Sequence, residues 1–468
     1  MTDLILLLPE LVLVGAAVAL ILVARHVRHA RSAVTWVVIA AIAATFAGWV
    51  FSGRGPATAF HNTIAGDGYA QFFKILFATT LALAALLSVR HLDAERVPSA
   101  EFCALLLLAT TGMMLAASAL DLLTLYLGLE LMSLCSYILV GITRDRPTSN
   151  EAAIKYFLLG SFASALLLYG IALAYGVTGV TDYAGMASAL SERSLAQSPL
   201  LLVSVALLAG GLAFKIAAVP FHAWAPDAYQ GASTPVAAFL AAGSKAAGLA
   251  ALGRVSLVAF SPEHGLWAII LVGLAALSMA IASLLAVSQS DVKRLLAYSS
   301  IAHAGYALLG LVSGTPEGAS ATMTYAFVYA FMTLGAFGVV IGLGERGESL
   351  EGYRGLAFVS PVTAGLMLLF LLSLTGIPPT AGFAAKFGVI LSAVRAGYVA
   401  LAVLAVACSV VSAFFYLRIA VLMYMTEPQG LAPGRLPVAV SAALAVAAAV
   451  TVIGGIFPDT LAAWTTPP

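Results

Sequence analysis

Charged residues are scarce in this sequence: Asp, Glu, Lys and Arg make up 9% of its 468 residues, whereas hydrophobic residues make up 62%. A soluble globular protein carries about 25% charged residues, so this chain has too little polar surface to coat a water-soluble domain. The formal net charge is +1 and there is no basic tail, which argues against nucleic acid as a partner. The composition therefore predicts a polytopic membrane protein embedded in a lipid bilayer.

Cysteine is also nearly absent. Cys103, Cys135 and Cys408 fall in different apolar segments without CxxC or CxH spacing, so the sequence contains no disulfide framework and no iron–sulfur or zinc motif. No GxGxxG or Walker-type loop follows a strand, and no strand-forming segment is visible. We therefore expect no nucleotide, flavin, haem or metal cofactor in this chain.

The sequence does contain a succession of apolar runs of roughly 20 residues, each long enough to cross a bilayer core of about 30 Å. They predict an all-α membrane protein of about fourteen transmembrane helices, beginning near Leu4, Ala33, Tyr69, Glu101, Asp121, Glu151, Leu200, Pro235, Gly265, Asp291, Ala319, Pro361, Tyr398 and Leu436.

Charges at the ends of these runs predict their sidedness. The first run follows Asp3 and precedes the basic segment "RHVRHARS", the reverse of the order in a cleavable signal peptide, so both termini of a fourteen-helix chain are expected outside. Twelve basic residues then face the cytoplasm and three face outward, in agreement with the positive-inside rule. The twelve are Arg25, Arg28, Arg31, Arg90, Arg96, Arg144, Arg146, Lys293, Arg294, Arg346, Arg354 and Arg435, and the three are Arg54, Arg193 and Arg395.

Two apolar segments are interrupted by helix breakers. Leu200–Gln230 contains Pro220 and Pro226, and Pro361–Ala396 contains "GIPPTAG", so we predict unwound backbone at membrane depth in helices seven and twelve. Paired interruptions indicate internal repeats around a transport site. Because an odd number of helices separates the two breaks, the second repeat is inverted.

This pattern divides the chain into four predicted parts: residues 1–98 with three helices, 99–260 with the first five-helix repeat, 261–427 with the inverted repeat, and 428–468 with the last helix. Local sequence gives modest support. "YILVGI" at Tyr137 is echoed by "YALLGL" at Tyr306, 169 residues later (306 − 137). Lys215 and Lys386 lie 171 residues apart (386 − 215).

A few ionisable residues are predicted to lie deep within the helices: Glu130, Lys215, Lys245, Lys386 and His303. A charge at a helix centre costs roughly 2.5–3.5 kcal/mol on insertion scales, so these residues are functional candidates. The simpler interpretation is that each lysine snorkels or is satisfied by a partner for packing alone, and that the histidine is a neutral imidazole bonded to backbone.

The remaining ionisable residues within spans have simpler interpretations. Lys155 is expected to pair with Glu151 one turn earlier on the same helix. Four others lie nearer the ends of their spans and are expected to act as interfacial anchors: Glu10, Lys74, Arg254 and Arg418.

Buried carboxylate and lysine side chains can carry protons without a cofactor. Desolvation disfavours the charged form of a lysine, whereas a carboxylate about 4 Å away favours it by about 4 kcal/mol at an effective dielectric constant near 20. If a rearrangement separates Glu130 from Lys215, the lysine releases its proton to the next site. The segment "GLAFKIAAVPFHAWAPDAYQG" places proline breaks and His222 beside Lys215, and we expect His222 and His303 to act as accessory relay groups.

Five segments carry a family resemblance: "LELMSLCSYILVG", "EAAIKYFLLGSFASALLLYGIAL", "FKIAAVPFHAWAPDAYQGASTPV", "SDVKRLLAYSSIAHAGYALLG" and "LTGIPPTAGFAAKF". Together they resemble the antiporter-like membrane subunits of respiratory complex I, the bacterial NADH:quinone oxidoreductase, and above all its N-type subunit. The resemblance covers nearly the whole chain. It implies two inverted repeats with broken helices seven and twelve, and a proton relay through Glu130, Lys215, Lys245 and Lys386.

Lysine at position 386 and the short segment after Pro458 favour the N type over the M and L types. The resemblance further implies a bacterial inner (plasma) membrane and partner subunits of the antiporter-like M type and the smaller K, J, A and H types. NADH, FMN, iron–sulfur clusters and quinone would then belong to partner subunits, and this chain would carry no redox centre.

Three other classes stay open on the sequence. An Mrp-type cation/proton antiporter and a related membrane-bound hydrogenase or oxidoreductase share this pattern of residues. A scaffold subunit with vestigial charges is disfavoured, because burying four charges costs roughly 10 kcal/mol with no structural need visible. Co-purification separates the complex I interpretation from the Mrp interpretation. A flavin- and iron–sulfur-bearing arm indicates complex I, whereas small hydrophobic partners and sodium-dependent exchange indicate Mrp.

Overall fold

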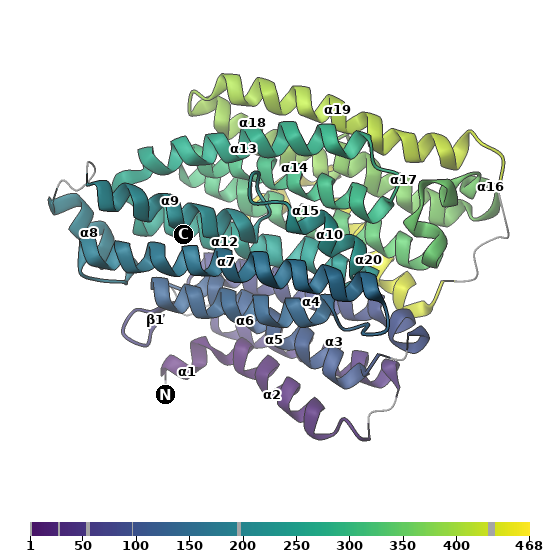
Figure 1. Ribbon diagram of the computed structural model, residues 1–468, viewed down its shortest axis with the longest axis horizontal. Helices are drawn as coiled ribbons and strands as arrows, with labels where there is room; N and C mark the ends of the chain where they lie inside the picture. Colours follow the sequence, from purple (N-terminus) through teal and green to yellow (C-terminus); the bar gives the residue numbers. More distant parts are fainter. Residues whose placement is uncertain (1, 27–28, 53–56, 96, 194–197, 429–435) are drawn as a thin grey trace.

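The chain folds into a bundle of helices that lie side by side in the computed structural model, which describes residues 2–26, 29–52, 57–95, 97–193, 198–428 and 436–468 (Figure 1). The N-terminal part contains α1 (Thr2–Leu6), α2 (Leu8–Leu22), α3 (Ala30–Ser52), β1 (Thr58–Ala59), β2 (Ile64–Ala65) and α4 (Gly68–Ala94). The middle part contains α5 (Ser99–Ser118), α6 (Leu122–Val140), α7 (Pro147–Thr178), α8 (Tyr183–Arg193), α9 (Pro199–Lys215), α10 (Trp224–Gly231), α11 (Thr234–Phe239) and α12 (Lys245–Arg254). The last part contains α13 (His264–Val287), α14 (Val292–Val312), α15 (Pro316–Leu343), α16 (Leu356–Val359), α17 (Pro361–Thr375), α18 (Ala381–Arg395), α19 (Val399–Tyr424), α20 (Val438–Ile456) and α21 (Pro458–Ala462).

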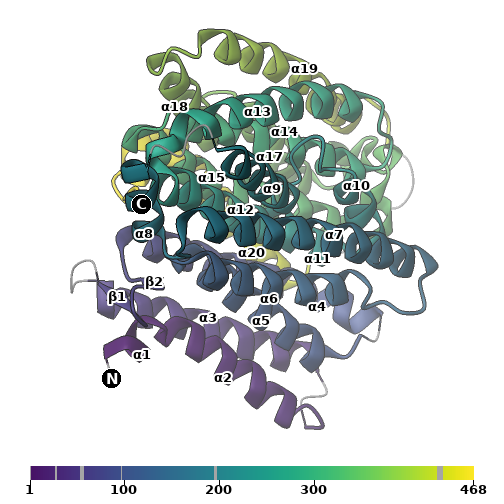
Figure 2. The same ribbon diagram turned by 60° about the vertical axis from the view of Figure 1, so that its left-hand side comes forward.

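In chain order, the helices progress across the bundle from one flank to the opposite flank. Helices α2 and α3 form one flank and α19 forms the opposite flank, with α7, α9 and α12 between them (Figures 1 and 2). Helix α20 returns to the interior and packs against α15, α18 and α4. Helices α12, α14 and α15 are the most deeply buried, and they carry Lys245, His303 and Tyr325, respectively.

Within the described residues, eleven helices are long and apolar enough to cross a membrane, and three shorter apolar helices accompany them at Leu8–Leu22, Pro199–Lys215 and Pro361–Thr375. The all-α polytopic class is therefore confirmed. A helix begins within four residues of every predicted start. The count of fourteen spans and the four-part division of the chain stay predictions.

Both predicted breaks are present. Helix α9 ends at Lys215 and α10 begins at Trp224, while α17 ends at Thr375 and α18 begins at Ala381. Proline lacks a backbone N–H and clashes with the preceding turn, which is why neither segment continues as one helix. Lys215 is the last residue before its break, whereas Lys386 lies in the second turn after its own. Although the 171-residue spacing of the two lysines is close to the 169-residue spacing of the echoed segments, the lysines therefore do not occupy equivalent positions relative to their breaks.

Two local features were not predicted. Strands β1 and β2 form a short antiparallel hairpin, although no strand was expected. The eighth predicted span is not a uniform α-helix, because π-helical segments at Leu240–Ser244 and Val255–Ala259 flank α12. A π-turn inserts one extra residue per turn and leaves no clear mark in apolar periodicity, so sequence could not locate it.

The interpretation of Glu10, Lys74 and Arg254 as interfacial anchors was wrong. Lys74 Nζ lies 2.8 Å from Glu10 Oε1, and both side chains are about 95% buried between α2 and α4, with exposures of 6% and 5%. Arg254 is 1% exposed and binds Asp67. Arg418 is exposed, as expected of an anchor. Four basic residues used for sidedness lie outside the described residues: Arg28, Arg54, Arg96 and Arg435.

Helices α5 and α6 cross with their backbones in direct contact. A Cβ atom added to Gly112 would lie 2.5 Å from the backbone nitrogen of Met132, and one added to Gly128 would lie 2.7 Å from that of Ala116. Small residues of this kind allow membrane helices to approach closely. Glu130 lies between Gly128 and Met132 on α6, so the crossing is at the level of this glutamate.

Candidate functional site

Glu130 and Lys215, predicted from sequence to act together, meet in the interior of the bundle. Lys215 Nζ donates to Ser133 Oγ at 2.6 Å, to Glu130 Oε1 at 3.4 Å and to Ser164 Oγ at 3.5 Å. The same Glu130 oxygen accepts a hydrogen bond from Ser164. The lysine side chain is 3% exposed and the glutamate 21% exposed. The N–H groups of the Lys215 ammonium are thus divided between one carboxylate and two hydroxyls.

Local sequence fixes the two partners differently. Asp121 caps α6 by accepting from the backbone nitrogens of Leu123 and Thr124, which sets the register that points Glu130 and Ser133 inward. Lys215 instead lies at the free end of α9. Two residues later, Ala217 adopts a left-handed φ of 55°, which costs an L-residue about 1 kcal/mol. The lysine therefore sits beside strained, non-helical backbone.

Lys245 is fully buried on α12, one residue after a π-helical segment. Its Nζ donates to Ser300 Oγ at 2.6 Å, its one hydrogen-bond partner within the described residues. One turn later, a Cβ atom at Gly248 would lie 2.6 Å from Ile216 Cγ2, so α12 packs directly against the end of α9 that carries Lys215. The second lysine is thus brought close to the backbone of the first.

Lys386 reaches back to the other half of its own broken helix. Its Nζ donates to the Thr375 carbonyl at 2.9 Å and to Ser409 Oγ at 3.1 Å, and it lies 4.6 Å from the centroid of the Tyr306 ring. Thr375 is the last residue of α17. A cation there is favoured by the free carbonyls and the dipole of the helix end, which is also the simplest structural reason for a lysine at this position.

Residues on one face of α14 lie between Lys245 and Lys386. Ser300, His303 and Tyr306 are spaced three residues apart, so they lie on one face of α14, and they contact in turn Lys245, two tyrosine hydroxyls and Lys386. His303 Nδ1 is 2.7 Å from Tyr325 Oη and His303 Nε2 is 3.3 Å from Tyr416 Oη. Tyr416 in turn bonds Ser299. Hydroxyl and imidazole groups thus extend along the buried interval between the two lysines.

His222 is not drawn into this arrangement. It lies in the break between α9 and α10, is partly exposed, and its Nδ1 has no hydrogen-bond partner among the described residues. No hydrogen bond in the described part of the chain links it to any of the three lysines.

A network of ion pairs connects α7, α10 and α14. Asp227 on α10 accepts from Lys155 on α7 at 3.0 Å and from Arg294 on α14 at 2.8 Å. Lys155 also pairs with Glu151 at 2.8 Å, as predicted, but its pairing with Asp227 was missed. These groups line a polar cavity of about 460 Å³ together with Gln230 and Glu348. The network connects the second half of the broken α9–α10 segment to α14.

Sequence reasoning missed the hydroxyl groups that hold the lysines, which are Ser133, Ser164, Ser300 and Ser409. It also missed the two that contact His303, which are Tyr325 and Tyr416. Only Ser133 carried a usable signal, because it follows Glu130 by three residues on one helix and must share its face. Among the described residues, no group of three or more His, Cys, Asp or Glu side chains is placed to hold a metal ion.

The fold and the buried lysines define a polytopic membrane protein of the antiporter type. The family described as NADH:quinone oxidoreductase/Mrp antiporter, transmembrane, matches residues 119–412. A subunit of the respiratory complex I structure from Thermus thermophilus is 35% identical, covers 97% of this chain and 98% of its own, and superposes with a TM-score of 0.83. A subunit of the Mrp complex from Dietzia sp. superposes with a TM-score of 0.87 over 99% of this chain and 96% of its own, but at 24% identity it is similar in fold alone.

Sequence identity places the chain within this class. The NADH-quinone oxidoreductase subunit N 2 of Rhizobium meliloti (strain 1021) is 44% identical over 96% of this chain and 94% of its own length. The chain belongs to the NADH-quinone oxidoreductase subunit N family, and its relatives are subunits of an enzyme complex. Its solved neighbours lie in multisubunit assemblies, so it is a multi-pass membrane protein of the kind that assembles with other membrane subunits.

Proposed function

We propose that this chain moves protons across a membrane as the antiporter-like N subunit of a proton-pumping NADH:quinone oxidoreductase. The observation that carries the proposal is the buried contact of Lys215 Nζ with Glu130 Oε1 at 3.4 Å, at the end of a broken helix. Within about 4 Å a carboxylate favours the charged lysine, and moving the two apart favours release of the proton. Separation of the pair would therefore release one proton from the lysine, and return of the pair would allow the lysine to bind another.

The proposed path runs from Glu130 and Lys215 through Lys245 to Lys386. Its support is spatial: α12 packs on the end of α9, and α14 contacts Lys245 through Ser300 and Lys386 through Tyr306. We assign His303 to the path as an accessory group because both ring nitrogens meet hydroxyls. His222 is retained only as a group beside the path, since it has no such partner.

The proposal assigns redox chemistry to partner subunits. NADH, FMN, iron–sulfur clusters and quinone would be bound there, and this chain would carry no cofactor of its own. Neighbouring subunits would be of the M, K, J, A and H types in a bacterial inner membrane. The termini would face outward, and residues 99–260 and 261–427 would form the two inverted repeats. Residues Ile5, Leu6 and Thr466–Pro468 line one cavity, which is compatible with both ends lying at one face.

The test uses the assembled complex in proteoliposomes. Glu130→Gln and Lys215→Ala should each abolish NADH-driven acidification while leaving membrane insertion and assembly intact, because each removes one partner of the pair. Glu151→Gln is the matched control: it makes the same change in a glutamate that is paired with a lysine but is 65% exposed, and it should pump normally. Normal pumping by either of the first two variants would refute the assigned role.

The competing function is that of a subunit of an Mrp-type cation/proton antiporter, favoured by similarity of fold alone. Purification from membranes separates the two. A peripheral arm with flavin and iron–sulfur absorbance supports the oxidoreductase, whereas sodium-dependent proton exchange without that arm supports the antiporter.

A further inference from the structure

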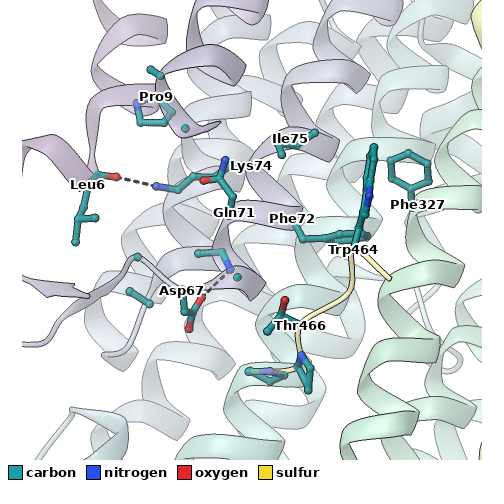
Figure 3. A pocket seen from close by; sticks show the side chains of 18 of the residues that line it. Leu6, Pro9, Asp67, Gln71, Phe72, Lys74, Ile75, Phe327, Trp464 and Thr466 are labelled. Carbon is teal, nitrogen blue, oxygen red and sulfur yellow. Dashed lines mark hydrogen bonds between the residues drawn. The ribbon is translucent and has the colours of Figure 1, made fainter. Parts of the chain in front are cut away.

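A cavity of about 580 Å³ lies away from the relay residues, between α2, α3, the first turns of α4 and the last residues of the chain (Figure 3). Its size is typical of a small-molecule site. Apolar side chains form much of the wall: Pro9, Phe72, Ile75, Phe327 and Trp464. The polar groups that line it are fewer: Asp67, Gln71, Lys74 and Thr466. The proposed proton path includes none of these residues.

The charged groups of the cavity are already neutralised. Lys74 Nζ lies 2.8 Å from Glu10 Oε1 and donates to the Leu6 carbonyl at 2.9 Å. Asp67 receives two hydrogen bonds from Arg254, at 2.6 and 2.7 Å. Burial opposes the charge on Asp67, but the hydrogen bonds and positive charge of Arg254 outweigh it and hold the pKa of the carboxyl below its ordinary value. Among the described residues, the lining side chains therefore leave no charge unpaired, and the charged part of a ligand would lie outside the cavity.

Gln71 supplies the free polar group. Its amide lies over Gly48, where a Cβ atom would stand 2.7 Å from Gln71 Nε2, so a larger residue at position 48 would displace the amide from its present place. Gln71 Nε2 is buried and has no hydrogen-bond partner within the described residues. A buried donor without an acceptor is costly, and in native structures it usually meets a ligand or an ordered water. The cavity thus calls for a neutral hydrogen-bond acceptor.

The depth of Gln71 in the membrane indicates which hydrogen-bond acceptors lie at its level. Helix α4 begins at Gly68, so at 1.5 Å per residue Gln71 lies about 5 Å and Ile75 about 10 Å below its end. The headgroup layer on each side of a bilayer is roughly 5–7 Å thick. With the start of α4 taken as the outer surface of the headgroup layer, Gln71 stands near the level of lipid ester carbonyls and Ile75 near the start of the hydrocarbon. Trp464 beside them is a residue type enriched at this interface.

We propose that this cavity binds one diacyl glycerophospholipid, with an ester carbonyl accepting a hydrogen bond from Gln71 Nε2. One acyl chain lies along Phe72, Phe327 and Trp464, and the lipid joins the N-terminal helices to the C-terminal segment. This site goes beyond the proposed proton pathway and does not depend on it.

Native mass spectrometry of the purified complex, after extensive washing in detergent, tests the site. The wild type should retain a phospholipid on this subunit. Gly48→Leu should abolish retention, because the added side chain fills the space now occupied by the Gln71 amide. Gln71→Leu keeps the volume but removes the donor, and should weaken retention about fivefold.

Gly15→Leu is the matched control, since it adds the same side chain at an exposed position of α2, where a Cβ atom meets nothing within 4 Å. This variant should retain lipid like the wild type. Equal retention in all three variants would overturn the site. Recovery of an isoprenoid quinone in place of a phospholipid would overturn the assigned ligand. If Gly48→Leu fails to assemble, Gln71→Leu decides alone.

Discussion

The ammonium of Lys215 lies closer to the hydroxyl oxygen of Ser133, at 2.6 Å, than to the carboxylate of Glu130, at 3.4 Å. The hydroxyl therefore stabilises the charged lysine together with the carboxylate while the pair is closed. Hydrogen bonds to charged groups contribute about 1.5–3 kcal/mol, so Ser133→Ala should lower NADH-driven pumping about tenfold or more in proteoliposomes. Ser136→Ala is the matched control, because that buried hydroxyl bonds only the Met132 carbonyl of its own helix. Equal loss in both variants would contradict the role of Ser133.

A second prediction concerns Tyr416, whose hydroxyl contacts both Ser299 and His303. Tyr416→Phe keeps the ring and its packing but removes this connection, so pumping should fall about fivefold while thermal stability changes little. Tyr353→Phe is the control, since Tyr353 is equally buried and its hydroxyl donates to the Gly347 carbonyl at 3.0 Å, away from the path. Proton uptake measured side by side in the two variants checks the prediction. An equal or larger loss in Tyr353→Phe would remove Tyr416 from the path.

A third prediction concerns the ion pairs at Asp227, which connect α7, α10 and α14. Asp227→Asn weakens two ion pairs at once and should lower the midpoint of thermal unfolding by about 2 °C, because exposed pairs contribute little individually. It should also reduce pumping, because α14 carries Ser300 and His303. Glu151→Gln removes only an exposed pair and should leave both measurements unchanged. If the two variants behave alike, Asp227 does not position these helices.

The buried pair of Glu10 and Lys74 gives a fourth prediction. Lys74→Met leaves Glu10 buried without its partner and should destabilise the chain by about 3–5 kcal/mol. The double variant Glu10→Leu, Lys74→Met should recover most of that loss, because a buried pair can be replaced by apolar residues at little cost. Thermal unfolding of the single and double variants in one detergent checks this. A double variant no more stable than the single one would contradict it.

The pairing of Asp67 with Arg254 gives a prediction for pH. Because Arg254 holds the pKa of Asp67 below its ordinary value of 3.8, the pair contributes stability that is fully present above that value. The contribution is lost as the pH falls through the lower, folded-state pKa. As the pH falls below about 4, wild type should therefore lose more thermal stability than Asp67→Asn, which lacks this titration. Parallel curves for the two proteins would show that the pair does not contribute.

Much of the architecture was accessible from sequence because the bilayer imposes it. Apolar runs must be about 20 residues long, and prolines remove backbone hydrogen bonds wherever they stand, so the helix starts and the breaks after Lys215 and Thr375 could be predicted. Glu130 and Lys215 stood out because a charge at that depth is costly. These inferences need only local sequence.

The missed features depend on what lies opposite a residue in space. Ser164 and Ser300 resemble any other serine in an apolar helix, and only the arrival of Lys215 or Lys245 from another helix gives them a role. Glu10 and Lys74 were assigned to the interface because no local pattern pairs residues on α2 and α4. The π-helical segments around α12 depend on packing and leave no apolar period of their own.

The crossing of α5 and α6 at Gly112 and Gly128 restricts how the Glu130–Lys215 pair can open. Because the two backbones approach this closely, α6 cannot slide or roll without colliding with α5, so the helix that carries the carboxylate stays in place. The gap between acid and base must then widen from the lysine side, by rotation of its flexible stem or by rearrangement of the uncoiled backbone that follows it. Substituting alanine at either glycine should therefore disturb charge transfer by displacing the fixed partner.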